Sequence, residues 1–366
     1  MGGDSIHNSR MRQWFASSPP VTWGIRQLRE LLIGALRQGP IPQHVAFVMD
    51  GNRRFARNNH LETVEGHNLG FEALARILEV CYKSGVKVVT VYAFSIENFK
   101  RSKYEVDALM EMAKTKLTQL SQHGALLDRY GASIRILGQR EMVRPDVLER
   151  VDAAIKLTEK NTRCILNVCF PYTSREEITG AVQKTVSDFS KPIPPPLKRP
   201  FSETHITRNL RAQTNNSVPE DAHSQNSVSR SASTSSSKSS QDQAHDSSSA
   251  DADPESSAPT LVDPADAHDK IREVYPDSES ITAETLTANM LTAEAPPLDL
   301  LVRTSGVQRL SDFMLWQCHQ TTSIVFLDCL WPEFDLWEFL PVLVEWQWQR
   351  KKQLENARGR LRDKED

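Results

Sequence analysis

Three polar clusters in this chain carry side chains that bind anions. The first comprises Asp50, Gly51, Asn52, Arg53 and Arg54. An arginine guanidinium matches phosphate oxygens with paired hydrogen bonds, and a lone carboxylate beside phosphate oxygens suits Mg²⁺, which takes one or two carboxylates and keeps several waters. This mixture favours a metal-bound phosphate ester. The alternative is a surface turn with unpaired charges.

Two further clusters have a similar composition. One contains Ser95, Glu97, Asn98, Lys100 and Arg101, and the other runs from Arg303 to Asp312 and includes Arg309 and Ser311. Together the clusters place five arginines around Asp50, a charge that two diphosphates would balance. The chain has no GxxxxGKS/T loop, so we do not expect a P-loop nucleotide site.

Each cluster follows a short apolar run, which is the pattern of a buried strand. We expect strands from His44 to the turn at Asp50 and at 86–94, 132–138, 163–170, 298–302 and 323–327, and helices at 66–84, 103–127, 145–159, from Ser174, through 286–291 and at 335–349. Strands alternating with helices predict an α/β domain with a mostly parallel six-stranded sheet flanked by helices. The carboxyl ends of such strands, and therefore the three clusters, meet at one edge.

Composition limits the number of domains. The chain has 366 residues, a net charge of -3 and 39% hydrophobic residues, enough for two average domains. However, residues 187–280 form a low-complexity insert, rich in Ser and Pro, that we expect to be mostly disordered. We therefore predict one domain at 40–186 and 281–350, with a disordered N-terminus at 1–20 and a charged tail at 351–366. Serine clusters in the insert are either phosphorylation sites or a solvated loop.

The segment 21–39 has apolar residues at helical spacing, with arginines at other positions. Such a basic amphipathic helix either lies in a membrane interface or packs on its own domain. No run of 18 apolar residues occurs, so we expect no membrane-spanning helix. The near-neutral charge gives no case for a nucleic-acid partner. The five cysteines show no metal-ligand spacing, and we expect buried, reduced thiols in a cytosol-facing protein.

Five motifs in order resemble the cis-prenyltransferases. They are His44-Val-Ala-Phe-Val-Met-Asp-Gly-Asn-Arg-Arg54, Gly66-His67, Tyr92-Ala-Phe-Ser-Ile-Glu-Asn-Phe-Lys-Arg101, Arg303-Thr-Ser-Gly with Arg309-Leu-Ser-Asp-Phe-Met-Leu-Trp-Gln317, and Leu330-Trp-Pro-Glu-Phe334. The resemblance covers about residues 40–350. Within the family the chain looks most like eukaryotic, particularly fungal, catalytic subunits that make dehydrodolichyl diphosphate.

The resemblance implies elongation of farnesyl diphosphate with isopentenyl diphosphate units, giving a long polyprenyl diphosphate for dolichol and protein glycosylation. Asp50 would bind Mg²⁺, and Asn98 matches a position linked to proton removal, although an amide is a weak base and suits positioning better. The allylic diphosphate would contact Gly51, Asn52, Arg53, Arg54, His67, Ser95, Glu97 and Arg101. The isopentenyl diphosphate would contact Arg303, Arg309 and Ser311.

The resemblance also implies a hydrophobic tunnel for the growing isoprenoid, with Leu109 or Ala113 on its wall. Three features of the bacterial members are missing. This chain has Thr63 where they have an arginine and Val307 where they have a glutamate, and it lacks their second metal-binding glutamate near Thr322. The C-terminal Arg-x-Gly motif is also absent, because Arg358 and Gly359 are adjacent. We therefore expect a partner subunit to supply that motif, and the chain alone to be nearly inactive.

The expected location is the cytosolic face of the endoplasmic reticulum membrane, as a peripheral protein in a heteromeric complex. Two other functions remain open from the sequence. One is a non-catalytic scaffold subunit of the same fold, which would have no need of Asp50, Asn98 and Arg303 together. The other is a phosphatase on a similar sheet, which predicts a nucleophile or an acid/base group beside Asp50.

Overall fold

The computed structural model describes residues 19–122, 125–193 and 274–362. The chain separates into two units, one of residues 1–190 and 277–366 and one of residues 191–276. The account below concerns the described part of the first unit. The expectations for the N-terminus before Pro19 and for most of the 187–280 insert fall outside the described residues.

The sheet has six strands. They are β1 (His44–Val48), β2 (Val88–Tyr92), β3 (Ala132–Leu137), β4 (Cys164–Cys169), β5 (Leu300–Arg303) and β6 (Ser323–Phe326), in the spatial order β3-β4-β2-β1-β5-β6. All the strand pairs of this sheet are parallel. The predicted α/β class and six-stranded sheet are therefore confirmed, and β1, all of whose residues are buried, lies inside the sheet.

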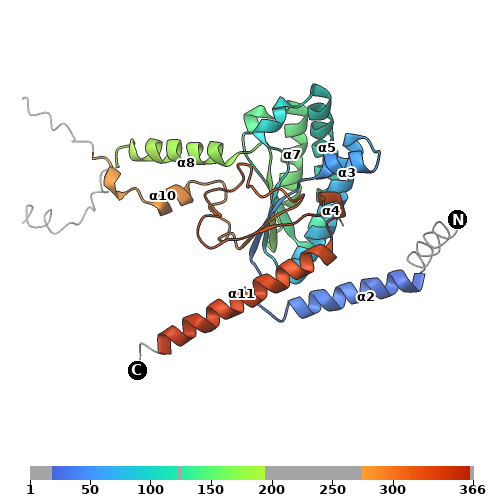
Figure 1. The fold of residues 1–366 in the computed structure, drawn as a ribbon. Coiled ribbons are helices and arrows are strands. Elements are labelled where there is room, and N and C mark those ends of the chain that lie inside the picture. The colour runs from blue at the N-terminus through green and yellow to red at the C-terminus, as the bar shows by residue number, and fades with distance from the viewer. Residues whose placement is uncertain (1–18, 123–124, 194–273, 363–366) are drawn as a thin grey trace, which may run out of the picture. The chain divides into compact units, whose positions relative to one another are not determined.

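Helices cover the sheet and connect its strands. They are α2 (Pro19–Leu36), α3 (Asn52–Asn58), α4 (Thr63–Ser84), α5 (Lys103–Ser121), α6 (Leu126–Tyr130), α7 (Pro145–Thr158), α8 (Ser174–Phe189), α10 (Ala283–Ala288) and α11 (Leu336–Arg362), with the 3-10 turns η1 (Ile96–Lys100), η2 (Arg140–Met142), η3 (Ser278–Ser280) and η4 (Trp331–Glu333). Figure 1 shows α4, α5 and α7 together beside the sheet, whereas α8 contacts α10.

The two faces of the sheet are covered differently. Successive strand residues point to opposite faces. Val45 and Phe47 of β1 belong to the large core formed with α4, α5, α7 and α11. Ala46 and Val48 belong to a smaller core that includes Phe313 and neighbouring residues of the segment after β5. Residues near Phe313 therefore pack on the sheet while the same segment carries the third polar cluster.

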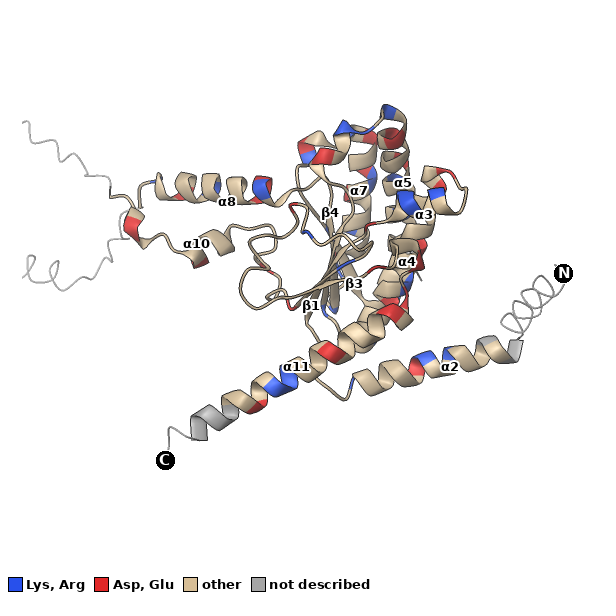
Figure 2. Cartoon of the chain, viewed as in Figure 1, with Lys and Arg blue, Asp and Glu red and all other residues tan. Residues whose placement is uncertain are grey.

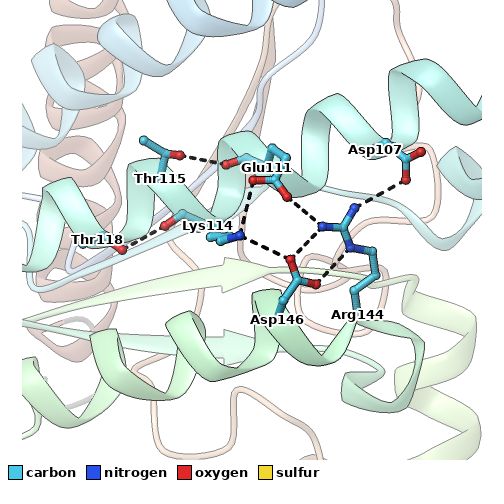
Figure 3. A network of polar contacts seen from close by, with 7 residues as sticks. All are labelled: Asp107, Glu111, Lys114, Thr115, Thr118, Arg144 and Asp146. Atoms are coloured by element: carbon cyan, nitrogen blue, oxygen red, sulfur yellow. Dashed lines mark hydrogen bonds and ion pairs between the residues drawn. The ribbon is translucent and has the colours of Figure 1, made fainter.

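A network of charged side chains joins α5 to the start of α7 (Figure 3). Arg144 donates to Asp146 and to Glu111 at 2.7 Å each, and more weakly to Asp107 at 3.5 Å. Lys114 donates to Asp146 at 3.3 Å. Exposed pairs of this kind each add little to stability.

Several element boundaries differ from the prediction. The helix expected at 103–127 is divided, because α5 ends at Ser121 and α6 begins at Leu126. The expected charged tail is helical as far as Arg362 because α11 continues through it. The fifth strand begins at Leu300 rather than Leu298, since pairing with β1 starts there. The five cysteines are free and four of them are buried, which confirms that part of the prediction.

The short helix α3 was not predicted. Gly51 has φ 108°, a left-handed conformation that favours glycine, and it turns the chain from β1 into α3. The helix then lies against α4 where that helix has glycines: a Cβ on Gly66 would lie 2.5 Å from the Asn52 carbonyl oxygen, and one on Gly70 would lie 2.3 Å from Asn52 Oδ1. The two glycines therefore let α3 approach α4 closely.

Candidate active site

The ends of β1, β2 and β5 meet at one edge of the sheet, around a cavity of about 510 Å³. The register places Val48 beside Arg303, so the residues that follow β1 face the end of β5. Most of the predicted site residues line this cavity: Asp50, Asn52, His67, Ser95, Glu97, Asn98, Arg101, Arg303, Arg309 and Ser311. The sequence therefore predicted a real convergence of the three clusters.

Asp50 and Arg303 form the centre of the site. The Arg303 Nη2 atom donates to Asp50 Oδ2 at 2.8 Å, and Nη1 donates to Ser311 Oγ at 2.6 Å and to the Arg309 carbonyl oxygen. Arg303 is 4% exposed, whereas the Asp50 side chain is 38% exposed. The guanidinium is thus fixed inside the protein, and the carboxylate remains open to the cavity.

The carboxyl group of Asp50 is held in its charged form. Burial alone would raise its pKa, but the hydrogen bond from Arg303 and the positive charge of Arg303 outweigh that effect and lower the pKa below its usual range. The Gly51 backbone N–H adds a further hydrogen bond to Asp50 Oδ1 at 2.8 Å. A permanently ionised carboxylate therefore faces the cavity at neutral pH.

The backbone of Asp50 is also fixed. Its carbonyl oxygen accepts a hydrogen bond from Thr304 Oγ1 at 2.7 Å and another from the Trp331 backbone N–H at 3.0 Å. Arg54 lies outside the cavity lining and donates to the Ser305 carbonyl oxygen at 2.7 Å. The turns after β1, β5 and β6 are thereby joined.

Asn98 has a structural role in the second cluster. Its Oδ1 atom accepts a hydrogen bond from the Ser95 backbone N–H at 3.0 Å, and Ser95 Oγ accepts one from the Glu97 backbone N–H at 3.2 Å. These reciprocal bonds form a capping box at the start of η1. Asn98 lines the cavity with its oxygen so engaged, which fits a positioning role better than a basic one.

Glu105 organises the cations of the same side and was not predicted. Arg101 Nη1 donates to Glu105 Oε1 at 2.8 Å. The same Oε1 atom lies 3.7 Å from His67 Nε2 and 4.0 Å from Arg53 Nε. Burial, followed by the charge of Arg101, lowers the pKa of His67 to about 4, so His67 is neutral at pH 7. The pattern Ser-x-x-Glu from Ser102 to Glu105, a helix-start signal directly after Arg101, could have pointed to this glutamate.

A second, apolar cavity of about 130 Å³ lies between the sheet and helices α4 and α5. It shares Met49, Asn52, His67, Ala93 and Leu109 with the polar cavity. Both Leu109 and Ala113 line it, as expected of the tunnel wall. The site therefore combines a charged mouth with an apolar interior.

The residues fit a metal only together with a ligand. In the part of the chain that the structure describes, no three His, Cys, Asp or Glu side chains gather at a metal-binding distance. Thr322, near which a metal-binding glutamate was expected and is missing, donates to the Leu298 carbonyl oxygen at 2.7 Å. Asp50 is exposed to the cavity beside the arginines, which suits a cation that completes its shell with phosphate oxygens.

Comparison with known proteins identifies the family. The family model described as "Putative undecaprenyl diphosphate synthase" matches residues 48–221 and 256–354. The chain belongs to this family, the cis-prenyltransferases. The predicted family and the predicted class of enzyme, a transferase of prenyl groups, are therefore confirmed. The match omits residues 222–255, within the predicted insert.

Other cis-prenyltransferases are similar to this chain over most of its length. A dehydrodolichyl diphosphate synthase complex subunit of Schizosaccharomyces pombe is 41% identical over 338 residues, covering 92% of this chain and 97% of the relative. The human subunit of the same name is 33% identical over 312 residues, covering 85% and 69%. The crystal structure of lavandulyl diphosphate synthase from Lavandula x intermedia, 21% identical, has a TM-score of 0.54 and covers 84% of this chain and 95% of that one. That structure shares the cis-prenyltransferase fold.

Proposed function

We propose that this chain is the catalytic subunit of a dehydrodolichyl diphosphate synthase complex. It would elongate farnesyl diphosphate with isopentenyl diphosphate units to a long-chain polyprenyl diphosphate for dolichol synthesis and protein glycosylation. The observation that carries the proposal is the joining of the arginine-lined cavity to the apolar one through shared residues such as Met49 and Leu109. A prenyl diphosphate has the same two parts, a charged head and an apolar tail.

The two substrates would occupy different sides of the polar cavity. The allylic diphosphate would contact the turns after β1 and β2, with His67 and Arg101 of the cavity lining and the neighbouring Arg53 among its partners. The isopentenyl diphosphate would contact the turn after β5, where Arg309 and Ser311 lie beside the buried Arg303. Placing the two diphosphates side by side brings the reacting carbons together and reduces the entropic part of the barrier.

In the reaction, a carbon–oxygen bond of the allylic substrate breaks, a carbon–carbon bond to the isopentenyl unit forms, and a proton leaves that unit. Negative charge grows on the departing diphosphate, and fixed guanidinium groups aimed at it lower the barrier. Mg²⁺ held by Asp50 and diphosphate oxygens would further neutralise that charge. Asn98 would orient the isopentenyl unit, and the diphosphate is the candidate proton acceptor.

The alternative of a non-catalytic scaffold subunit is less well supported. A scaffold has no need of an ionised Asp50 open to the cavity, nor of Arg303 fixed by Asp50 and Ser311. The printed names of the relatives describe complex subunits. A partner that supplies the Arg-x-Gly motif remains part of the proposal.

The membrane proposal rests on α2. Ile33 and Leu36 are buried against the domain and Arg29 pairs with Asp335, so one side of α2 packs on the protein. Trp23 and Leu31, each 66% exposed, lie on α2 without such cover. Figure 2 shows both basic and acidic residues along the helix. In the described residues, no helix is long and apolar enough to cross a membrane. We propose that α2 contacts the cytosolic face of the endoplasmic reticulum membrane.

The function is tested by incorporation of labelled isopentenyl diphosphate. The complex is purified from source cells through a tag on this chain, and is compared with the chain alone and with a complex carrying Asp50→Ala. We expect long polyprenyl products from the native complex, nearly none from the chain alone, and a loss of at least about 100-fold in the variant. Equal incorporation by the Asp50→Ala complex would refute the proposal.

A further inference from the structure

The N-terminus of α8 is capped by a residue from another part of the chain. The first backbone N–H groups of a helix have no partner inside it, and Thr173 at this start makes no side-chain cap hydrogen bond. Instead, the Ser174 N–H donates to the Asp312 carbonyl oxygen at 2.8 Å, and the Arg175 N–H donates to Asp312 Oδ1 at 3.0 Å. Asp312 thus performs the capping function from 137 residues away.

The same two segments are joined by side chains. Arg175 Nε donates to Asp312 Oδ2 at 2.7 Å, and the Leu315 N–H donates to Ser174 Oγ at 2.7 Å. The Asp312 side chain is 15% exposed and that of Arg175 is 74% exposed, so a surface arginine pairs with a carboxylate that is largely covered. Arg175 Nη2 also lies 3.8 Å from Glu97 Oε1. Arg175 therefore contacts both the second and the third polar cluster.

The segment held in this way has an unusual backbone. Ser311, Asp312 and Met314 have φ of 52°, 61° and 47°, in the left-handed region that non-glycine residues seldom adopt. Such a conformation persists only where the surroundings hold it, and it clusters at functional sites. Phe313 and Met314 are fully buried on the sheet, and Asp312 is bonded to α8. The conformation of Ser311 is therefore imposed from both sides.

We propose that Arg175 and Asp312 form a latch that positions Ser311, and through it Arg303, for the diphosphate of the isopentenyl substrate. The proposal rests on the proposed function for the identity of that substrate. The latch residues act through Ser311 Oγ, which accepts the hydrogen bond from Arg303 Nη1 at 2.6 Å. Loosening the latch raises the KM for isopentenyl diphosphate. Asp312→Asn leaves the KM for farnesyl diphosphate unchanged, because it keeps Arg175 beside Glu97 and because the allylic side is bonded through Glu105.

The test uses three variants of the purified complex: Arg175→Ala, Asp312→Asn and both together. Asparagine tolerates the left-handed conformation and can still accept the Arg175 N–H, so Asp312→Asn removes only the ion pair. We expect each single variant to raise the KM for isopentenyl diphosphate about tenfold, and the double variant to do no more, because both remove one interaction. Arg140→Ala, which breaks the exposed pair with Asp152, is the matched control and should change neither KM.

Two outcomes would overturn the latch. One is an unchanged KM for isopentenyl diphosphate in both single variants. The other is an effect of Arg175→Ala with none of Asp312→Asn, which would mean that Arg175 contacts the substrate itself.

A second measurement does not depend on the reaction. Amide hydrogen exchange of the peptide 309–317 in the substrate-free complex should be faster in Asp312→Asn than in the native complex and unchanged in Arg140→Ala. Equal exchange in Asp312→Asn and native complexes counts against the latch whatever the activity. An active Asp50→Ala complex, in contrast, would refute the proposed function and leave the exchange result standing.

Discussion

The Asp50 carboxylate accepts a hydrogen bond from the Arg303 guanidinium at 2.8 Å, although 253 residues separate the two. The pair joins the end of β1 to the end of β5. Its two members differ in exposure: Arg303 is buried, and Asp50 opens to the cavity. The pair thus acts as a fixed cation with an accessible anion at the point where the two substrates would meet.

Replacing Arg303 by lysine should be severe even though the charge is kept. The planar guanidinium donates to Asp50 and Ser311 at once, and a single ammonium group cannot reproduce this fork. We expect kcat/KM for isopentenyl diphosphate to fall about 100-fold in Arg303→Lys. The exposed Arg309→Lys should lose about tenfold or less. Steady-state kinetics of the complex measure both, and equal losses would contradict a special role for the buried fork.

Two variants of Asn98 separate its structural role from its chemical role. Asn98→Asp retains an oxygen that can accept the Ser95 N–H, but it replaces the amide donor by a negative charge next to the diphosphate sites. We expect unfolding free energy within about 0.5 kcal/mol of the native value and activity reduced by about 100-fold. Asn98→Ala should lose about 1 kcal/mol as well. Urea unfolding and incorporation assays test the pair of variants, and an active Asn98→Asp complex would contradict the positioning role.

The buried His44 should make stability depend on pH. Its Nδ1 bonds the Pro296 carbonyl oxygen at 2.9 Å and its Nε2 bonds Thr90 Oγ1 at 2.7 Å. Because a carbonyl only accepts, Nδ1 carries a proton. Burial lowers the pKa of His44 from 6.5 to about 4.

The unfolded chain therefore binds more protons than the folded one between these values. The contribution of His44 is complete above pH 6.5 and is lost as the pH falls to 4, a change of about 3 kcal/mol. Urea unfolding from pH 7 to pH 4 should show this slope in the native chain and less of it in His44→Asn, which keeps a donor toward Pro296. Identical slopes would show that His44 does not cause the change.

The apolar cavity should limit product length. Ala113 lines it, whereas Thr115 lies on the exposed side of α5. An indole at position 113 would occupy the space needed by the growing chain, so Ala113→Trp should shorten the polyprenyl products by several isoprene units. Thr115→Trp is the matched control and should leave them unchanged. Chromatography of the labelled products distinguishes the two, and unchanged products from Ala113→Trp would place the isoprenoid elsewhere.

The sequence predicted the strands well because long apolar runs end in sharp polar turns, and it predicted the meeting of the clusters because parallel strands share an edge. It missed α3, whose residues show no apolar period and which forms because Gly66 and Gly70 admit Asn52. It also missed Glu105, a charged residue on an ordinary helix start. The contact between Arg175 and Asp312 joins positions far apart in the chain, and no local pattern specifies it.

The order of strands in the sheet affects synthesis of the protein on the ribosome. β1 is made early and pairs with β2, but its other edge pairs only with β5, which begins at Leu300. Until about 250 further residues have been made, the backbone groups along that edge of His44–Val48 have no strand partner. An unpaired and mostly apolar edge on a nascent chain invites aggregation. The arrangement that joins Asp50 to Arg303 therefore leaves the growing chain prone to aggregation until β5 has been made.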